Sequence, residues 1–403
     1  MICPISENCF GNNLRSIKLA RIAAVPFHIV SLFKEQIEYL RDAGMKVTLV
    51  SSSGPELSEF NFSSMLSFEN INMSRSLSMR KDLIALFKLY RLFRKKKFDI
   101  VHSSTPKAGL LTAIAGFLAR VPVRLHTFTG QPWVTLKGPM HYLAKASDKL
   151  IGVLDTACYA DSKSQRQFLI DEKVISAKKI SVIGEGSVAG VNLSRFDPKR
   201  WSLLEKNQLR KELSIETSSK IVIFLGRVAR DKGVAELVSA FQKLLELNYD
   251  VDLLLVGPHD QECGERKASS ELKIPLGPRI HHTGYTDRPE RYLAISDIFC
   301  LPSYREGFGT AVIQAAAMGV PAVGTRINGL VDAVVDGTTG ILVAAHDDKA
   351  LFDALRKLLD NPALVKKMGE AAKERSMKNY DARIINADLA REYKRYVSGG
   401  FCK

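Results

Sequence analysis

Residues 221–233 have the sequence IVIFLGRVARDKG, and this stretch decides the fold class. Five apolar residues run up to Gly226, which is typical of a strand buried on both faces of a parallel sheet. Lys232 and Gly233 then lead into a helical pattern over 234–247. Because strand, glycine-containing turn and helix follow one another here, the stretch predicts an α/β protein with parallel sheets.

The same alternation continues in both directions from this stretch. Strands are expected at 18–25, 45–51, 98–102, 123–128, 251–256, 280–283 and 298–301, with 150–160 and 180–183 continuing the pattern. Helices are expected after residue 32, ending at Gly44, and at 82–97, 108–119 and 382–397. The regularity breaks between 184 and 201, where GEGSVAGVNLSRFDPKRW forms a long loop with a domain boundary near 192–198. We therefore predict two doubly wound, Rossmann-like domains, 18–195 and 196–379, with 380–403 packing back on the first.

Composition excludes several protein classes. The chain has 403 residues, 46% hydrophobic and 25% charged, which excludes collagenous, coiled-coil and low-complexity proteins. The six cysteines lie far apart without a CxxC pair, so we expect reduced thiols of a cytosolic protein and no metal site. Residues 1–16 lack a signal-peptide pattern, and the apolar run 108–119 is too short to span a bilayer.

Positive charge is concentrated in the first half of the chain. Residues 1–200 contain 29 Lys and Arg against 16 Asp and Glu, a net charge of +13, whereas the remainder has a net charge of +2. This asymmetry indicates an anionic partner for the first half, such as a lipid surface, a polyphosphate or a nucleic acid, or else a solvated basic face. No nucleic-acid-binding motif is present, so we expect no nucleic acid partner.

Two motifs place binding groups at strand ends. In the first, Arg227 follows the strand that ends at Gly226 and Lys232 precedes a helix, which suits a diphosphate because positive charge and backbone N–H groups converge there. In the second, SYREGFGTAVIQAAAMGVP at 303–321, Glu306 and a glycine loop open a helix of small residues. This arrangement suits a phosphate or sugar hydroxyls, although Glu306 could also simply cap the helix.

With RINGLVD at 326–332 and DGTTGILV at 336–343 downstream, the order of these motifs resembles glycosyltransferase family 4. The resemblance covers most of residues 18–395 and implies retaining enzymes of the GT-B fold, with two Rossmann-like domains facing across a cleft. In the first half, the segments HSSTPKAGLLTAIAG, LHTFTGQPW, YADSKSQRQFL and VNLSRFDP resemble a bacterial subgroup that builds lipid-linked polysaccharide repeat units. That subgroup implies N-acetylhexosamine transfer to undecaprenyl-diphosphate sugars, as in lipopolysaccharide O-antigen or capsule biosynthesis.

The resemblance also assigns roles to individual residues. It implies that Arg227 and Lys232 hold the nucleotide diphosphate, that Glu306 contacts the donor sugar, and that His126 approaches the reacting sugars from the first domain. The remaining donor-binding residues that it implies are Gly226, Gly307, Phe308, Gly309, Thr310 and Gln314. The sequence departs from the family pattern at Gln314, where a Glu usually binds the ribose, and at Asp332, where Glu is frequent. It departs again at residues 25–28, VPFH, which replace a glycine-rich loop.

The expected enzyme is thus a hexosyltransferase (EC 2.4) that needs no cofactor or metal, uses a UDP-sugar, and acts on a polyprenyl-diphosphate-linked acceptor. Its expected location is cytoplasmic and peripheral, on the inner face of the plasma membrane. Residues 79–98 and 133–143, which combine basic and apolar side chains, are the candidate membrane contacts, or else ordinary cover for the sheet. The alternative is a GT-B-fold sugar-nucleotide epimerase or hydrolase that acts without an acceptor. A dehydrogenase is excluded because no GxGxxG follows a strand.

Overall fold

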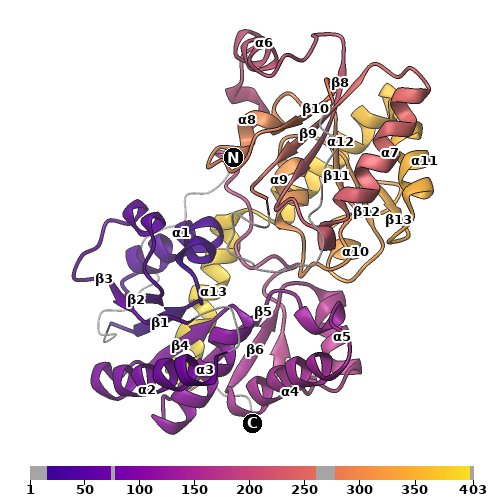
Figure 1. The fold of residues 1–403 in the computed structure, drawn as a ribbon. Coiled ribbons are helices and arrows are strands. Elements are labelled where there is room, and N and C mark those ends of the chain that lie inside the picture. Colours follow the sequence, from indigo (N-terminus) through magenta and orange to yellow (C-terminus); the bar gives the residue numbers. More distant parts are fainter. Residues whose placement is uncertain (1–15, 74–77, 260–276, 400–403) are drawn as a thin grey trace. The chain divides into compact units, whose positions relative to one another are not determined.

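Two parallel sheets covered by helices make up the protein in a computed structural model, which describes residues 16–73, 78–259 and 277–399 (Figure 1). The first sheet has seven strands in the order β3-β2-β1-β4-β5-β6-β7, and the second has six in the order β10-β9-β8-β11-β12-β13. Both orders reverse direction beside the first strand of the sheet, which is the topology of doubly wound α/β folds. The predicted fold class is therefore confirmed.

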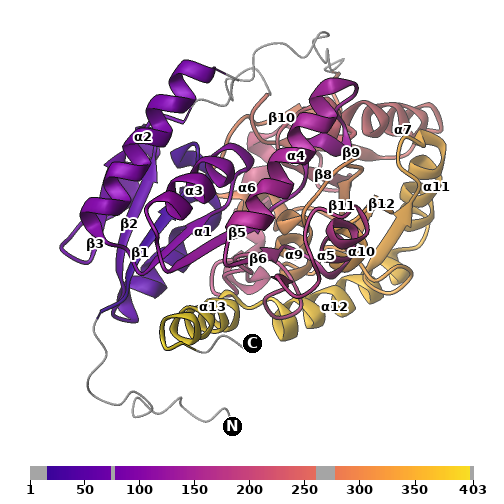
Figure 2. The ribbon, with the colours of Figure 1, turned by 90° about the horizontal axis from the view of Figure 1, so that it is seen from below.

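The first sheet alternates with helices α1 to α5. Its strands are β1 (Lys18–Ile22), β2 (Lys46–Ser51), β3 (Leu66–Asn70), β4 (Ile100–Ser103), β5 (Val123–Phe128), β6 (Ala157–Ala160) and β7 (Ile180–Ser181). Its helices are α1 (Pro26–Asp42), α2 (Met79–Lys96), α3 (Pro106–Leu118), α4 (Pro139–Leu154) and α5 (Lys163–Asp171). Figure 2 shows α2 and α3 side by side, and their buried faces share one apolar cluster that includes Leu89, Phe93, Leu111 and Ala115.

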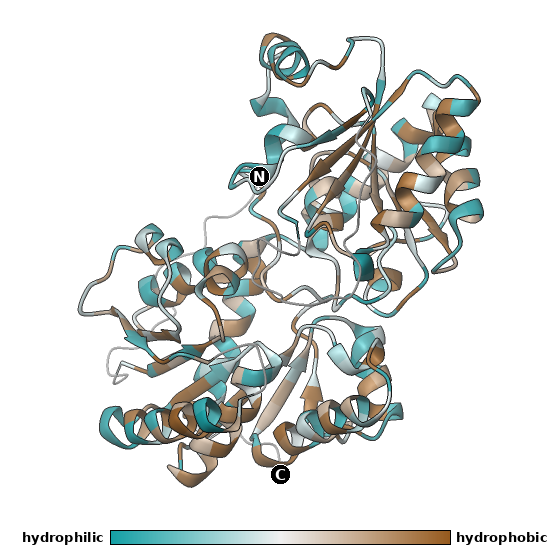
Figure 3. Cartoon of the chain, in the orientation of Figure 1, coloured by the Kyte–Doolittle hydropathy of each residue, from teal (hydrophilic) through white to brown (hydrophobic). Residues whose placement is uncertain are grey.

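The second sheet lies within helices α6 to α12. Its strands are β8 (Lys220–Leu225), β9 (Val251–Val256), β10 (Ile280–His282), β11 (Ile298–Leu301), β12 (Ala322–Thr325) and β13 (Gly340–Val343). The helices are α6 (Leu203–Glu212), α7 (Val234–Glu246), α8 (Pro289–Leu293), α9 (Thr310–Ala317), α10 (Leu330–Ala333), α11 (Asp348–Leu359) and α12 (Pro362–Asn379). Every residue of β9 is buried, as expected for a strand covered on both faces. Figure 3 shows these strands as hydrophobic and the outer surfaces of their helices as hydrophilic.

Contacts group the described residues into two units. Unit 1 contains those of Met1–His126, Leu154–Thr156 and Ala390–Lys403, and unit 2 contains Thr127–Val153 and those of Ala157–Leu389. The predicted boundaries 18–195 and 196–379 stay a prediction.

The last helix, α13 (Ala382–Val397), brings its second half into unit 1. There the Tyr393 hydroxyl accepts a hydrogen bond from Arg21 Nη1 at 3.3 Å and is hydrogen-bonded to His102 Nδ1. Arg21 Nη2 donates to Gln36 at 3.2 Å. All of these side chains except that of Gln36 belong to β1, β4 or α13, so a helix at the end of the described chain completes the polar interior of the first sheet.

The expected elements agree with the structure where apolar runs are long. The strands at 123–128, 251–256 and 298–301 and the helix at 382–397 have the bounds that the sequence predicts. Residues 150–160, which continue the predicted pattern, contain the end of α4 at Leu154 and β6 from Ala157. Cys3, Cys9, Cys263 and Cys402, with residues 1–15, lie outside the described residues, while Cys158 and Cys300 are buried.

No helix among the described residues combines the length and the apolar composition that crossing a bilayer requires.

Candidate active site

The first binding motif leaves the sheet at the end of β8. Gly226 has φ +155°, and Gly233, with φ +68°, is the N-cap residue directly before α7. A Cβ at Gly233 would lie 2.0 Å from the carbonyl oxygen of Pro302, the residue after β11. Only glycine fits that contact, so this turn brings Lys232 directly against the segment that follows β11.

The second motif leaves the sheet beside the first, because β8 and β11 are parallel neighbours paired at Val222 with Ile298. Gly309, with φ +88°, precedes α9, and Phe308 is buried with its ring edge toward Tyr380. Thr310 is the first residue of α9, and Gln314 lies one turn later on the same helix, partly exposed. The EGFG segment therefore forms the glycine loop and helix start that the sequence predicts.

Charged side chains of the two motifs form ion pairs with each other. Lys232 Nζ lies 2.6 Å from Glu306 Oε1, and both side chains are mostly buried, at 18% and 15% exposed. Asp231 Oδ2 lies 3.2 Å from Arg305 Nη2 and 3.8 Å from Arg227 Nη2. The sequence predicts that cations gather at this edge, and the structure pairs them with carboxylates of the same site. An incoming anion would therefore compete with Glu306 for Lys232.

A third segment, the end of β6 and the start of α5, packs on the EGFG loop; it lies within YADSKSQRQFL, but none of its residues is assigned to the site from the sequence. A Cβ on Gly307 would lie 2.5 Å from Asp161 Oδ2 and 2.6 Å from the Thr129 carbonyl oxygen. With its amide oriented so that both ends are satisfied, Gln165 donates to Gly307 O at 2.9 Å and accepts from Gly130 N at 3.1 Å. Asp161 is buried, and its pKa rises to about 8, first because of burial and then because of the charge on Glu306. Besides the resemblance carried by YADSKSQRQFL, the local sequence signal for this segment is an Asp–Ser pair directly after a strand.

Asp332, noted in the sequence for replacing a Glu, has a structural role. Its Oδ2 accepts from the backbone N–H of Ser164 at 2.8 Å, in the first turn of α5, and Ser164 Oγ accepts from Gly329 N at 2.8 Å. A carboxylate at a helix start is stabilised by the exposed N–H groups there. Asp332 therefore holds the start of α5 against α10, and Ser164 holds it against Gly329, the residue before α10.

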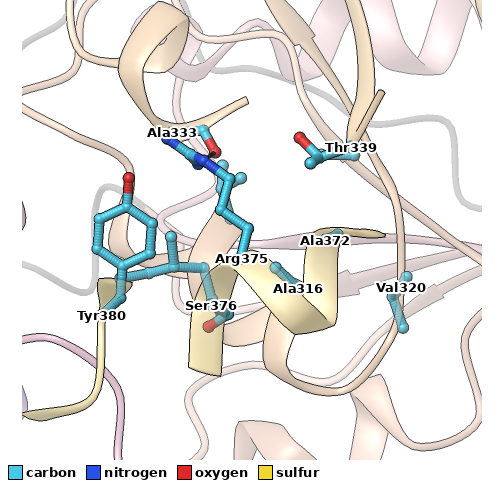
Figure 4. Close-up of a pocket in the computed structure, with 11 residues that line it drawn as sticks. Ala316, Val320, Ala333, Thr339, Ala372, Arg375, Ser376 and Tyr380 are labelled. Atoms are coloured by element: carbon cyan, nitrogen blue, oxygen red, sulfur yellow. Dashed lines mark hydrogen bonds between the residues drawn. The ribbon is translucent and has the colours of Figure 1, made fainter. Parts of the chain in front are cut away.

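A small pocket behind α9 supports this arrangement (Figure 4). Arg375 of α12 reaches across it, and its guanidinium donates to the carbonyl oxygens of Asp332 at 2.6 Å and Ala333 at 2.7 Å. Ser376 donates to Ile313 O at 3.0 Å. The Arg375 bonds satisfy carbonyls at the end of α10, and the Ser376 bond satisfies one in α9, so the side chains around this pocket hold α9 and α10 to α12.

His126, the residue expected to reach the sugars from the first domain, lies in unit 1 near the end of β5. It is buried, and its Nδ1 is hydrogen-bonded to Ser103 Oγ at 2.8 Å. Burial lowers its pKa to about 3, so the imidazole is neutral at physiological pH. The other predicted site residues, from Gly226 to Gln314, all belong to unit 2.

Within the described part of the chain, no three His, Cys, Asp or Glu side chains lie together as metal ligands would. Metal independence and the absence of a cofactor stay predictions.

Two family models match the chain in succession. Residues 30–187 match Glycosyltransferase Family 4, and residues 205–375 match Glycosyl transferases group 1. The matched regions include HSSTPKAGLLTAIAG, LHTFTGQPW and YADSKSQRQFL in the first half and the two donor motifs in the second, all of which carry the resemblance in the sequence.

Characterised relatives match over most of the chain. The capsular polysaccharide biosynthesis glycosyltransferase CapM of Staphylococcus aureus is 31% identical over 378 residues, covering 92% of this chain and 97% of CapM. The UDP-Gal:alpha-D-GlcNAc-diphosphoundecaprenol alpha-1,3-galactosyltransferase of Escherichia coli is 27% identical over 353 residues, covering 86% and 89%. Both are transferases, which does not favour the epimerase or hydrolase alternative.

Solved structures share the fold at low sequence identity. Sucrose-phosphate synthase from Thermosynechococcus elongatus has a TM-score of 0.78 at 21% identity and covers 95% of this chain and 100% of its own. Anabaena HepE, solved in complex with UDP and glucose, has a TM-score of 0.75 at 17% identity and covers 94% and 99%. These similarities establish a GT-B fold.

Proposed function

This chain belongs to glycosyltransferase family 4 and is a hexosyltransferase, and we propose that it transfers an N-acetylhexosamine, with retention, from a UDP-sugar to a lipid-diphosphate-linked saccharide. The product would be an intermediate of a surface polysaccharide such as capsule or O-antigen. Support for the acceptor class comes from the Escherichia coli relative, whose name specifies a diphosphoundecaprenol-linked acceptor, and from the capsular relative CapM.

One observation carries the donor assignment: the two glycine-containing motifs leave neighbouring strands β8 and β11, and their side chains meet as the Lys232–Glu306 pair. A ligand at this edge would meet a cation, a carboxylate and the backbone of two helix starts together. A nucleotide diphosphate joined to a sugar has the matching groups, since phosphates bind cations and N–H groups and sugar hydroxyls bind carboxylates. We therefore assign the diphosphate to Arg227 and Lys232, and the sugar to Glu306 and the amides of Gly307, Phe308 and Gly309. Gly226, Thr310 and Gln314 complete the proposed donor site.

In the proposed reaction, the bond from the anomeric carbon to the donor phosphate oxygen breaks, and its electron pair stays on the diphosphate. The acceptor hydroxyl oxygen forms the new bond on the same face of the sugar, and its proton passes to a phosphate oxygen of the leaving group. Negative charge therefore grows on the diphosphate, where Lys232 and Arg227 stabilise the transition state more than the ground state.

His126 is proposed to contact the reacting sugars as a neutral hydrogen-bonding group. Its Nδ1 is held by Ser103 Oγ, which fixes the ring, and its lowered pKa keeps it uncharged. A neutral imidazole suits hydrogen bonding to a hydroxyl and adds no positive charge next to a sugar that develops oxocarbenium character.

Helix α2 is the proposed contact with an anionic membrane. Its buried side, with Leu89 and Phe93, covers the sheet, as the alternative interpretation of this segment expects. Its other side exposes Met79, Leu83 and Phe87 at 84%, 62% and 58%. The exposed basic side chains interleaved with them are Arg80, Lys81, Lys88, Arg91, Arg94 and Lys95. Exposed apolar and basic groups on one side of a helix suit an anionic lipid surface, at about 1 kcal/mol for each basic residue near it.

A second candidate contact surrounds the start of α4, where Met140, Tyr142 and Leu143 are exposed. Both surfaces support peripheral attachment at the cytoplasmic face, where a lipid-diphosphate acceptor would be met.

The transfer reaction is tested with a panel of UDP-sugars and a short polyprenyl-diphosphate-linked saccharide, followed by NMR of the product's anomeric linkage. We expect one UDP-N-acetylhexosamine to be consumed only when acceptor is present, with the donor's anomeric configuration kept. Consumption without acceptor, or an inverted linkage, would contradict the proposal.

Membrane contact is tested by liposome flotation with and without anionic lipid. We expect the wild type to float only with anionic vesicles. The double variant Leu83→Glu, Phe87→Glu should no longer float with them. The matched control is Leu203→Glu, Leu204→Glu on α6, where both leucines are at least as exposed, at 74% and 79%. Equal flotation of the two double variants would contradict the assignment of α2.

A further inference from the structure

Asp161, which directly follows β6, is a buried titratable group near the proposed donor site that has no role in the proposed reaction. Its side chain is buried at 6% exposure, and Oδ1 has no hydrogen-bond partner among the described residues. Its backbone is fixed on both sides, because its N–H donates to Phe128 O at 3.3 Å and its carbonyl accepts from Ser187 N at 2.7 Å. The backbone that carries this buried carboxyl group is therefore held in place from both sides.

The EGFG loop is built around this carboxyl. Asp161 Oδ2 occupies the space that a Cβ of Gly307 would need, at 2.5 Å, and Gly307 directly follows Glu306. On the other side, Gly186 has φ +114°, and a Cβ there would lie 2.9 Å from the Asp161 carbonyl oxygen. Two glycines thus make room for Asp161, which shows that this position is enclosed by backbone and not merely covered by side chains.

Of the two neighbouring carboxyl groups, only that of Glu306 is paired with a cation. Lys232 pairs with Glu306 at 2.6 Å, whereas Asp161 has no ion-pair partner among the described residues. The other charged groups near Asp161 include Arg305 in the EGFG segment, Lys163 and Glu185, which pair with each other, and Asp332, which accepts from Ser164 N. Helix α5 also carries Arg166, which donates to Ile180 O at 2.9 Å, and Asp171, which accepts from Gln167 at 2.8 Å. Because a buried carboxylate without a counter-charge is costly, the second carboxyl of such a pair keeps its proton. The pKa of Asp161 accordingly rises to about 8, with burial and then Glu306 as the causes.

We propose that Asp161 is a positioning residue that works as a neutral carboxylic acid behind the EGFG loop. The diphosphate of the donor then meets one negatively charged carboxylate at this loop, that of Glu306, and not two. This inference rests on the proposed donor site. When the phosphates take Lys232 as their counter-ion, Glu306 loses its partner. A proton on the neighbouring Asp161 then keeps Glu306 from facing a second negative charge. Ionising Asp161 would oppose both the placement of Glu306 and the approach of the diphosphate.

The sign of the pH effect follows from this arrangement. Below about pH 8 Asp161 is protonated, and the donor binds with its full affinity. Above that pH the added negative charge raises the KM for the UDP-sugar, by up to tenfold for each pH unit, and changes kcat less.

The experiment measures KM and kcat for the UDP-sugar between pH 6 and 10 in the wild type, Asp161→Asn and Asp148→Asn. The amide of Asp161→Asn keeps the shape of the neutral acid, so we expect near-normal kinetics at pH 7 and a KM that no longer rises above pH 8. Asp148 of α4 is the matched control, because it is also a buried Asp with a raised pKa, about 7, but it is hydrogen-bonded to Trp133 Nε1. Asp148→Asn should keep the alkaline rise in KM.

A carboxyl ¹³C NMR titration of the whole enzyme without substrate gives a readout that does not depend on the proposed function. One Asp signal should titrate near pH 8 in the wild type and be absent in Asp161→Asn. If that signal is present but no UDP-sugar binds, the proposed function fails and the protonated state of Asp161 stands. An alkaline rise in KM that persists in Asp161→Asn, or a wild type whose Asp161 titrates near pH 4, would overturn the inference. Where Asp161→Asn does not fold, the Asp signal near pH 8 that remains in Asp148→Asn is the one assigned to Asp161, and its absence there would overturn the inference.

Discussion

Replacing Lys232 by Ala tests the proposed donor site most directly. The ammonium group is paired with Glu306 at 2.6 Å, at the point where the leaving diphosphate is proposed to gain charge. Removing one preorganised group of this kind typically lowers kcat by about 100- to 1000-fold, equivalent to roughly 2.7–4 kcal/mol of transition-state stabilisation. We expect a kcat loss in this range for Lys232→Ala and a smaller loss for Lys232→Arg, which keeps the charge.

The stability cost of this change is expected to be modest. Removing one partner of a fully buried ion pair costs about 3–5 kcal/mol, but both partners here keep some contact with water, so we expect roughly 1–2 kcal/mol. The control is Lys243→Ala, whose Nζ pairs with Asp348 at 2.7 Å on the outer surface of the same unit, at 41% and 39% exposure. Such surface pairs contribute about 0–1 kcal/mol, so the control should keep both stability and kcat.

The assay is single-turnover and steady-state transfer from the UDP-sugar, together with calorimetric binding of UDP and thermal unfolding of each variant. Lys232→Ala should bind UDP more weakly and melt only a few degrees lower. A folded Lys232→Ala enzyme with the kcat and UDP affinity of Lys243→Ala would refute the assignment of Lys232 to the diphosphate.

Three further outcomes follow from the same geometry. Gly307→Ala places a Cβ 2.5 Å from Asp161 Oδ2, so it should abolish transfer and lower the free energy of unfolding by about 2 kcal/mol or more. The control Gly277→Ala, whose Cβ would have nothing within 4 Å, should change neither transfer nor stability. Equal denaturation midpoints for the two variants would contradict this expectation. Glu306→Gln removes a charged hydrogen-bond acceptor, so it should lower kcat/KM by about 10- to 100-fold in transfer assays. The affinity of this variant for UDP alone should be kept or raised. An unchanged kcat/KM would exclude a contact between Glu306 and the sugar. Acidification from about pH 6.5 toward 3 protonates His126 in the unfolded chain only. The free energy of unfolding of the wild type should therefore fall by up to about 1.4 kcal/mol per pH unit because of this residue. In urea titrations at each pH, His126→Gln should lose stability less steeply.

The sequence predicts the donor site best where its residues are close in the chain. Arg227 and Lys232 follow a strand of uninterrupted apolar residues, and the glycines around Phe308 mark a loop before a helix of small residues. Both patterns are local, so the ends of β8 and β11 and the starts of α7 and α9 could be predicted without knowledge of tertiary contacts.

The contacts of Asp161, Ser164 and Gln165 with the EGFG and α10 segments could not be predicted in this way. They join residues more than 140 positions apart, and nothing in the local pattern of either segment specifies the other. Strands β3, β12 and β13 were also missed, because LSFEN, AVGT and GILV are short and contain Ser, Asn or Gly, which weaken the strand signal. The pairing of Lys232 with Glu306, 74 residues apart, likewise depends on the order of the strands in the sheet.

The contact between Tyr393 and Arg21 constrains the order in which the chain can fold. The two residues are separated by 372 positions, so during synthesis β1 leaves the ribosome long before its hydrogen-bonding partner exists. Until α13 arrives, the guanidinium of Arg21 would have to remain hydrated or be buried with Gln36 as its main support. The first sheet should therefore reach its final stability only after α13 has been synthesised. A nascent chain stalled before α13 should expose β1 to proteases and chaperones that the folded protein resists.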